Sequence, residues 1–531
     1  MQTQYGGLWR PVWATWVFGL LAIATFSCGA IAGEATPPSA TPANAGWRFH
    51  EPVVLDSTHP PVPEEDEVLA SPDRVRLIAC QDRFVLALVP RVNSPKEARA
   101  VTLWSEAPVG VWQKLATVQG VVGTPVVLPL GRDVAVVANS REDKDKPRVW
   151  RISAAGEIMS SAVPMAPAPG GGTPAERRRR DRMVVRFGTA ASQGESLGVF
   201  LLRGRNHGDT QEVLVVRSDD GGKTWQPEKS CGSIGYFEGE EGISGLVGYG
   251  DAGRSFGLLA ADIKEGEDEI EWKPVQFAAG ERPGTWRKEP LVWQDGLQQR
   301  LYRVPLNSAR SEASVLALYG AFDPGGDQVR FCLTRSEDQG RTWSKGDPIT
   351  GQIPVISMEY EAGLAAAGGH VAFSFAEQAE DAEYAAGRML LSRSPGQDFE
   401  PVPLDRYFRG QIIDAPAVAA TGDRMMLATQ VILDPQLDPR TYLVVQEYSA
   451  RSTPGELPLM RSARAQVRRL VVDLGAEDFE SRQRAARQLA TLGRAAKAEL
   501  LEEMRSTRDA EVRTRLRLIL GKLYPPCLQV N

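Results

Sequence analysis

One turn motif occurs twice in this chain, and it restricts the architecture more than any other feature. Ser218-Asp-Asp-Gly-Gly-Lys-Thr-Trp225 returns as Ser336-Glu-Asp-Gln-Gly-Arg-Thr-Trp343, so both segments read S-x-D-x-G-x-T-W and begin 118 residues apart. Each segment follows an apolar run that is typical of a strand. Because an internal repeat of this kind decides the whole architecture, the chain is predicted to be an array of similar β units.

The fixed positions of this motif suit a tight turn between two antiparallel strands. Ser and Asp side chains hydrogen-bond the amides of the turn, Gly accepts a positive φ, and Trp begins the next strand with a large apolar anchor. We therefore interpret both segments as structural turns. The residues with this role are Ser218, Asp220, Gly222, Thr224 and Trp225 in the first copy, and Ser336, Asp338, Gly340, Thr342 and Trp343 in the second.

Weaker copies of the motif fill the intervals and reveal a period. The aromatic anchors Trp225, Trp286, Trp343 and Phe399 lie 61, 57 and 56 residues apart. A period in the fifties with several strands per unit is the size of a propeller blade. Seven modules can be counted, so the chain is predicted to be mainly β, a six- or seven-bladed β-propeller over residues 46–450.

The first residues of the propeller are expected to close its ring. The segment 46–55 resembles the strands that follow the repeated turns, but it has no module of its own. The sixth module is expected to begin near Pro354, and the seventh, near Ile412, lacks a fourth strand. We therefore expect 46–55 to supply that strand, which removes the unpaired edge of an open array.

The N-terminal residues read as a secretory leader over 1–32. Arg10 precedes a 15-residue apolar core, and Ala30-Ile-Ala32 fits the small-residue cleavage rule. The core is shorter than the roughly 20 residues that a membrane span needs. We predict a flexible linker over 33–45, no transmembrane segment after leader removal, and a secreted, periplasmic or cell-envelope protein. Lipoprotein anchoring at Cys28 is the less favoured alternative.

The last part of the chain, 451–531, changes in composition to Arg, Ala, Leu and Glu. Its apolar residues recur at helical spacing, and Asp478 and Asp509 stand where N-caps belong. The segment resembles HEAT-type helical repeats and is predicted to form a small all-α domain. A helical unit this short is expected to pack on the propeller or on a partner, so a protein partner is one candidate ligand of this domain.

Charge and cysteine usage exclude several classes of function. The net charge is -6, so no global basic field suggests a nucleic-acid partner. The four histidines are scattered and no CxxC occurs, so we expect neither a metal site nor another cofactor. The mature cysteines, at positions 80, 231, 332 and 527, are expected to be buried thiols, with a single disulfide as the alternative.

The repeated turn resembles the Asp box, or BNR repeat, of sialidases and related propellers. In that family the boxes are structural and lie away from the active-site face. The resemblance therefore implies that Asp220 and Asp338 are turn residues and not catalytic acids.

A second resemblance to sialidases concerns the substrate. Tyr302-Arg-Val-Pro305 is similar to the family's [F/Y]-R-I-P motif, whose arginine clamps the substrate carboxylate. The resemblance implies that Arg303, beside Tyr302, binds a carboxylate, which suits a bidentate guanidinium. The motif stands in the fifth module, whereas the family carries it near the N-terminus. Arg303 as an ordinary surface residue is the alternative.

The same resemblance suggests catalytic candidates. The family's acid/base aspartate follows in the next loop, which implies Asp323 or Asp327. Sialidases use a tyrosine nucleophile that a glutamate activates, and Tyr360 and Glu361 bring these residue types together. Two functions follow: recognition of a glycan, with exo-sialidase hydrolysis as its catalytic form, or a non-catalytic interaction scaffold of the cell envelope.

We predict that the mature protein begins after Ala32. Cleavage there follows from the apolar core and the small residues that precede it. N-terminal sequencing or intact mass of the protein from its native host measures this directly. Recovery of Met1 to Ala32 intact on soluble cytoplasmic protein would contradict export.

Overall fold

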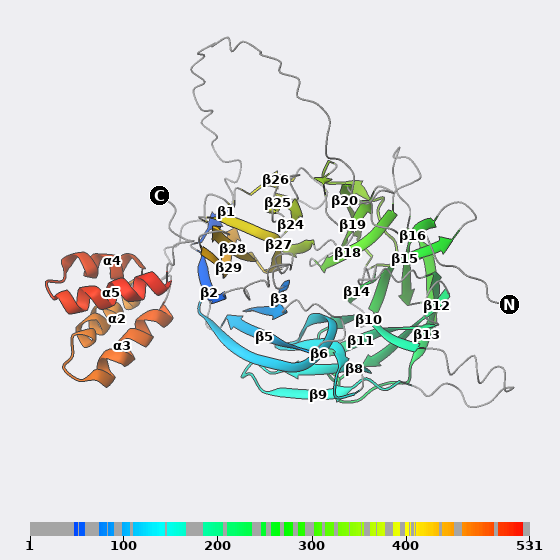
Figure 1. Ribbon diagram of the computed structural model, residues 1–531. Helices are drawn as coiled ribbons and strands as arrows, with labels where there is room; N and C mark the ends of the chain where they lie inside the picture. Colours follow the sequence, from blue (N-terminus) through cyan, green and yellow to red (C-terminus); the bar gives the residue numbers. More distant parts are fainter. Residues whose placement is uncertain are drawn as a thin grey trace, which may run out of the picture. The chain divides into compact units, whose positions relative to one another are not determined.

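The computed structural model describes most of the region after residue 46 (Figure 1). It describes 47–58, 74–89, 98–106, 110–165, 184–204, 210–235, 246–250, 256–265, 270–279, 285–291, 302–310, 314–322, 328–354, 362–377, 386–392, 399–450 and 459–523, with short gaps inside several ranges. These residues form antiparallel sheets followed by four helices. The predicted fold class, a β-propeller with a helical C-terminal part, is confirmed.

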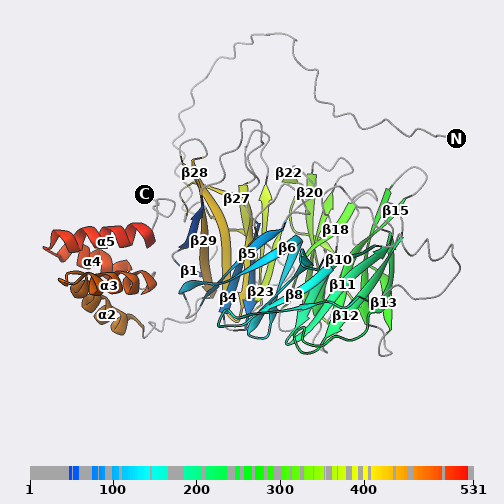
Figure 2. The same cartoon turned by 60° about the horizontal axis from the view of Figure 1, so that its bottom comes forward.

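Three blades are separate sheets whose strands follow chain order. Their strands run side by side, as β10 to β12 do in Figure 2. The third blade holds β10 (Val184–Gln193), β11 (Ser196–Gly204), β12 (Thr210–Ser218) and β13 (Lys229–Gly235). The fourth holds β14 (Leu246–Gly250), β15 (Phe256–Glu265), β16 (Ile270–Ala279) and β17 (Trp286–Pro290). The fifth holds β18 (Tyr302–Arg310), β19 (Val315–Phe322), β20 (Gln328–Ser336), β21 (Asp347–Pro348) and β22 (Ile353–Pro354).

The first two blades share one long strand. They hold β3 (Arg74–Cys80), β4 (Arg83–Val89), β5 (Arg99–Glu106), β6 (Trp112–Leu130), β7 (Asp133–Ser140), β8 (Lys146–Ile152) and β9 (Ile158–Ala162). The first part of β6 pairs with β5 and its last part pairs with β7. The register shifts between Val122 and Val126, where the strand passes from one blade to the next. One strand is therefore the outer strand of the first blade and the inner strand of the second.

The last two blades include the N-terminal strands. They hold β23 (Gly363–Ala367), β24 (His370–Glu377), β25 (Ala386–Ser392), β26 (Glu400–Pro401), β27 (Gln411–Thr421), β28 (Arg424–Asp434), β29 (Asp438–Ala450), β1 (Trp47–Phe49) and β2 (Val53–Thr58). Both β1 and β2 pair with β29, with Trp47 opposite Ala450 and Val53 opposite Val445. The N-terminal segment is thus the outer strand of the seventh blade.

The expected start of the sixth module near Pro354 is wrong. Ile353 and Pro354 form β22, which pairs with β20 of the fifth blade, and the sixth blade begins with β23 at Gly363. A proline has no amide hydrogen for a ladder, so Pro354 suits the end of a short edge strand better than an innermost strand.

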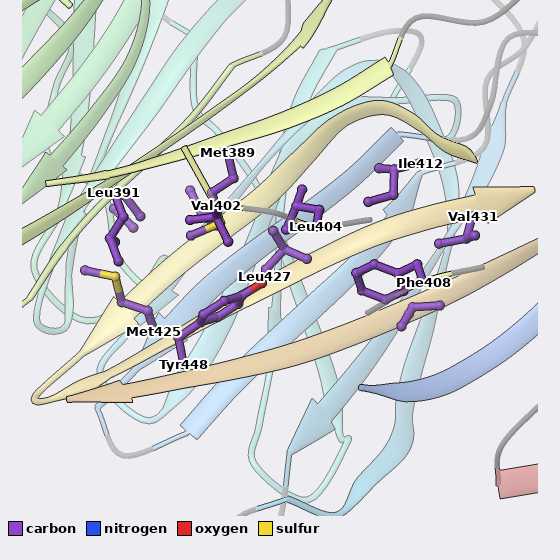
Figure 3. Packing of buried hydrophobic residues seen from close by; sticks show 14 of the residues in the cluster. Met389, Leu391, Val402, Leu404, Phe408, Ile412, Met425, Leu427, Val431 and Tyr448 are labelled. Atoms are coloured by element: carbon purple, nitrogen blue, oxygen red, sulfur yellow. The ribbon is translucent and has the colours of Figure 1, made fainter. Parts of the chain in front are cut away.

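The blades close on one another through their inner strands. Each of β3, β6, β10, β14, β18 and β23 contacts the next inner strand, and β27 contacts β3. Every neighbouring pair of blades in the described chain shares an apolar cluster. Figure 3 shows the one between the last two blades, where Met389 and Leu391 lie near Met425, Leu427 and Tyr448. The described strands therefore form seven blades.

An ion-pair cluster joins the seventh blade to the first. Arg424 of β28 contacts Glu106 of β5 at 2.7 Å and Glu447 of β29 at 3.0 Å. The Glu106 side chain is fully buried and also accepts the amide of Gly110. Burial lowers the pKa of Arg424, but its hydrogen bonds to Glu447 and Glu106 outweigh burial and raise the pKa overall. The guanidinium therefore neutralises the carboxylates of Glu106 and Glu447, whose burial without a cation would be strongly destabilising.

The described cysteines are buried thiols. Cys80, Cys231 and Cys332 form no disulfide, and burial raises the pKa of the Cys231 thiol. Cys527 lies outside the described residues. Within the described part of the chain, His, Cys, Asp and Glu side chains do not gather into a group that could hold a metal ion.

The C-terminal helices form two hairpins around one apolar cluster. They are α2 (Leu459–Leu474), α3 (Phe479–Leu492), α4 (Lys497–Ser506) and α5 (Ala510–Leu523). Asp478 accepts the amide of Ser481, and Asp509 accepts the amides of Glu511 and Val512, so both predicted N-caps are confirmed. Of the helices described, none has the length and apolar character that a membrane crossing requires.

We predict that Arg424→Ala destabilises the propeller by about 3–5 kcal/mol, because it leaves Glu106 buried without its cation. Arg388→Ala is the matched control, since Arg388 and Glu377 form an ion pair whose side chains are 55% and 41% exposed. That exposed pair should contribute at most about 1 kcal/mol. Urea unfolding compares the two variants. Equal losses would show that closure does not depend on the buried cluster.

Candidate functional site

The two repeated turns are closed by their own serine and aspartate side chains. In the first turn, Ser218 Oγ accepts the amide of Gly222 at 2.7 Å, and Asp220 accepts the amide of Thr224 at 2.8 Å and its hydroxyl at 2.6 Å. These bonds, first of all the one from the Thr224 hydroxyl, lower the pKa of Asp220 to about 2. A carboxyl group with this pKa carries no proton at neutral pH, so it cannot act as a general acid.

The second turn repeats this arrangement. Asp338 accepts the amide of Thr342 at 2.7 Å and its hydroxyl at 2.6 Å, and Ser336 Oγ accepts the amide of Gly340. Burial raises the pKa of Asp338, but the bonds from Thr342 outweigh burial and lower it overall. Gly340 has a φ of 90°, which a residue with a Cβ rarely adopts.

Each turn is attached to the preceding blade. The Tyr249 hydroxyl of the fourth blade donates to the Gly340 carbonyl, and the Trp343 indole donates to Gln276 of the same blade. In the first turn, Ser161 of the second blade donates to the Gly222 carbonyl at 2.6 Å. The repeated motif therefore ties consecutive blades together at this end of the strands.

Arg303 lies at the opposite end of the fifth blade. The register places Tyr302 opposite Phe322 at one end of the β18–β19 pair and Arg310 opposite Val315 at the other. Val315 in turn pairs with Ser336, the first residue of the repeated turn. The end of the blade that carries Tyr302 and Arg303 is therefore the end that the turns leave free.

Arg303 is half-buried, and the burial of its neighbour Val304 shows on which face of the sheet Arg303 lies. Val304 is buried in the apolar cluster between the fifth and sixth blades. Successive side chains of a strand point to opposite faces, so Arg303 lies on the face toward the fourth blade. Its strand is an inner strand, next to the middle of the ring.

The catalytic candidates lie outside the described residues. These are Asp323, Asp327, Tyr360 and Glu361. In chain order, Asp323 directly follows β19, which ends at Phe322 opposite Tyr302. Glu361 precedes β23, the inner strand of the sixth blade.

Two further arginines stand at the same end of the ring, and the sequence patterns did not single them out. Arg74 is the first residue of β3, and its guanidinium lies 3.4 Å from the Thr124 hydroxyl. Arg186 is on β10, where Val185 and Phe187 pack toward the second blade and place Arg186 on the face toward the fourth. Both stand in the opening residues of their modules, as Arg303 does, and that shared position is the signal that could have identified them.

Comparisons with known proteins concern the fold alone. No protein-family model matches this chain, and no curated protein matches it. The β-propeller domain of the Trilobed protease from Pyrococcus furiosus has a TM-score of 0.35 and 10% identity over 70% of this chain and 94% of its own. Acylaminoacyl peptidase from Pyrococcus horikoshii has a TM-score of 0.38 and 11% identity over 72% of this chain and 53% of its own. The α-L-arabinofuranosidase arb93a from Fusarium graminearum has a TM-score of 0.35 and 10% identity over 74% and 97%.

We predict that the contribution of Asp220 to stability disappears in acid. Its pKa is lowered to about 2 in the folded protein, so its stabilisation is present above the ordinary value of 3.8 and is lost as the pH falls through about 2. The difference in unfolding free energy between the wild type and Asp220→Asn should therefore shrink between neutral and strongly acidic pH. Asp423→Asn, an exposed acid of another turn, is the control. A difference that stays constant with pH would contradict the turn geometry.

Proposed function

We propose that this protein is an exported, sialidase-like propeller that recognises a glycan through a carboxylate group. The observation that carries the proposal is the position of Arg303. It is a half-buried arginine on an inner strand, at the end of the blades that the repeated turns leave free. Binding sites of propeller-like folds lie where loops leave a rigid scaffold, and this end supplies such a scaffold.

The chemistry of the guanidinium suits this ligand. It stays charged at every physiological pH and presents a planar fork that matches a carboxylate. A half-buried position strengthens its attraction to an anion, because less water screens the pair. The carboxylate of an acidic sugar bound here would meet the guanidinium of Arg303. The β18–β19 ladder holds the backbone of Arg303 in place.

The additional arginines support an anionic ligand. Arg186 and Arg303 stand on the inner strands on either side of β14, and both lie on the faces toward the fourth blade. Arg74 stands at the same end of the first blade. Positive side chains from several blades at one end of a ring favour a ligand with more than one acceptor group.

Hydrolysis is a separate step of this proposal. Asp323 or Asp327 would protonate the leaving oxygen, and Tyr360 with Glu361 would form and release the glycosyl intermediate, as the resemblance to sialidases implies. Recognition through Arg303 does not require this chemistry. A protein that binds acidic sugars without cleaving them would be a lectin-like member of the same architecture.

The second candidate function is a non-catalytic scaffold of the cell envelope. The observation that favours it is the helical part of the chain, which leaves Val472, Phe479 and Leu518 exposed. Exposed apolar side chains become a surface that binds other proteins where they form a contiguous patch. A protein in this role would bind its partners through the helices, whatever the propeller binds.

We predict that Arg303→Ala weakens binding of N-acetylneuraminic acid by about 2 kcal/mol or more, roughly thirtyfold, because the carboxylate loses its charged partner. Arg303→Lys keeps the charge but loses the planar fork, so the affinity of this variant should lie between that of the wild type and that of Arg303→Ala. The control is Arg310→Ala at the other end of the same strand, where the guanidinium binds Gln193. Calorimetric titration with the free sugar acid and with neutral glucose measures these affinities.

Turnover of a fluorogenic sialoside separates the two forms of the proposal. Asp323→Asn or Asp327→Asn should reduce turnover more than binding if one of them transfers the proton. Binding without turnover would indicate the lectin-like form. Folded wild-type protein that neither binds nor hydrolyses acidic sugars would contradict the proposal and favour the scaffold.

A further inference from the structure

The C-terminal part of the chain has a charge opposite to that of the rest. Residues 451–531 contain 16 Lys and Arg and 10 Asp and Glu, whereas residues 1–450 contain 45 and 57. Of those 16 cations, 14 are arginines. A basic helical part on an otherwise acidic protein is an electrostatic feature that the propeller proposal does not use.

Most of the excess positive charge of the helices belongs to one layer of the helical part. The first hairpin is α2 with α3 and the second is α4 with α5. The hairpins contact each other through α2 with α4 and through α3 with α5, so α2 and α4 form one layer and α3 and α5 form the other. In the full sequence, α2 and α4 contain six cations and four acids. The helices α3 and α5 contain seven cations and two acids, Glu480 and Glu511. The second layer is therefore the more basic of the two.

Four of these arginines and one leucine are exposed on α3 and α5. Arg484 and Arg487 of α3 and Arg513 and Arg517 of α5 are exposed, whereas Ala485, Leu489, Val512 and Leu516 of the same helices belong to the apolar cluster. Leu518, which follows Arg517, is 62% exposed. We name this surface, made of Arg484, Arg487, Arg513, Arg517 and Leu518, the α3–α5 face.

One guanidinium group of this face, that of Arg484, interacts with the N-cap carboxylate of its helix, Asp478. The hydrogen bond from the Ser481 amide lowers the pKa of that carboxyl group, and Arg484 helps to lower it. The other three form no ion pair among the described residues of their own helices. Among the described residues of α3 and α5, the ion pair is that of Arg515 with Glu511, and Arg515 is not part of the face. Arg487 donates to the Gln483 carbonyl and Arg513 to the Thr507 carbonyl, which leaves their charge uncompensated. Neighbouring like charges repel one another, so an anionic partner would relieve this repulsion.

We propose that the α3–α5 face binds an acidic polypeptide segment that carries an apolar side chain. The charge of the face selects a partner rich in Asp and Glu, because arginine binds carboxylates with two parallel hydrogen bonds. Leu518 adds an apolar contact, and interfaces between proteins combine arginines with large apolar residues. Acidic polysaccharides offer no apolar side chain. Membrane binding needs an apolar stripe along a helix, and α3 and α5 instead turn arginines outward.

The test uses the purified mature protein and a fluorescein-labelled synthetic peptide in which every fourth residue is leucine and the others are glutamate. The variant Arg484→Glu/Arg517→Glu reverses two charges of the α3–α5 face. The control Arg469→Glu/Arg505→Glu makes the same change of net charge on the exposed surfaces of α2 and α4. Fluorescence anisotropy at low and physiological salt gives the affinities, and circular dichroism verifies that both variants keep their helices.

We expect saturable binding of the labelled peptide that weakens as the salt concentration rises. The affinity should fall by about tenfold or more in the α3–α5 variant and stay within about twofold of wild type in the control. A pure polyglutamate peptide should bind more weakly than the peptide with leucine, and Leu518→Ser should remove that difference. Three results would overturn the proposal: no binding, equal loss in both variants, or tighter binding to a sulfated polysaccharide or anionic vesicles than to the peptide. None of these readouts depends on the sugar site.

Discussion

The structure depends on burial of both faces of each β-sheet against its two neighbours. A blade of four strands cannot bury two apolar faces alone, and each cluster between blades is built from both partners, such as Leu318 and Phe331 with Phe373 and Phe375. An open array would leave one face of the first blade and one of the last in water. Closure is therefore a requirement for stability, and the junction between the last and first blades is where it is met.

Two kinds of interaction make that junction. The ladders of β1 and β2 with β29 join chain segments from the two ends of the propeller. Arg424 adds a buried bridge to Glu106, 318 residues away in the chain. An apolar cluster packs between the seventh and first blades. The ion pair adds geometric specificity, because a misplaced blade would leave a carboxylate buried without its cation.

The two ends of the blades carry different side chains. At one end, the repeated turns bind the preceding blade through Tyr249, Gln276 and Ser161, so substitutions there act on stability. At the other end, Arg74, Arg186 and Arg303 stand on inner strands, at the edge opposite the turns. The helices add a second charged surface of their own.

The sequence by itself determined the features whose hydrogen bonds close within a few residues. The turns at Ser218 and Ser336 and the caps at Asp478 and Asp509 involve partners at most four positions away, so residue types alone predict them. The module period predicted the propeller, because each blade repeats the same local chemistry. Only the tertiary structure decided which strands begin each blade and which side chains meet across blades. The misplaced start of the sixth module, the Arg424–Glu106 pair and the alignment of Arg74 and Arg186 with Arg303 all depend on strand register over long chain separations, which no local pattern encodes.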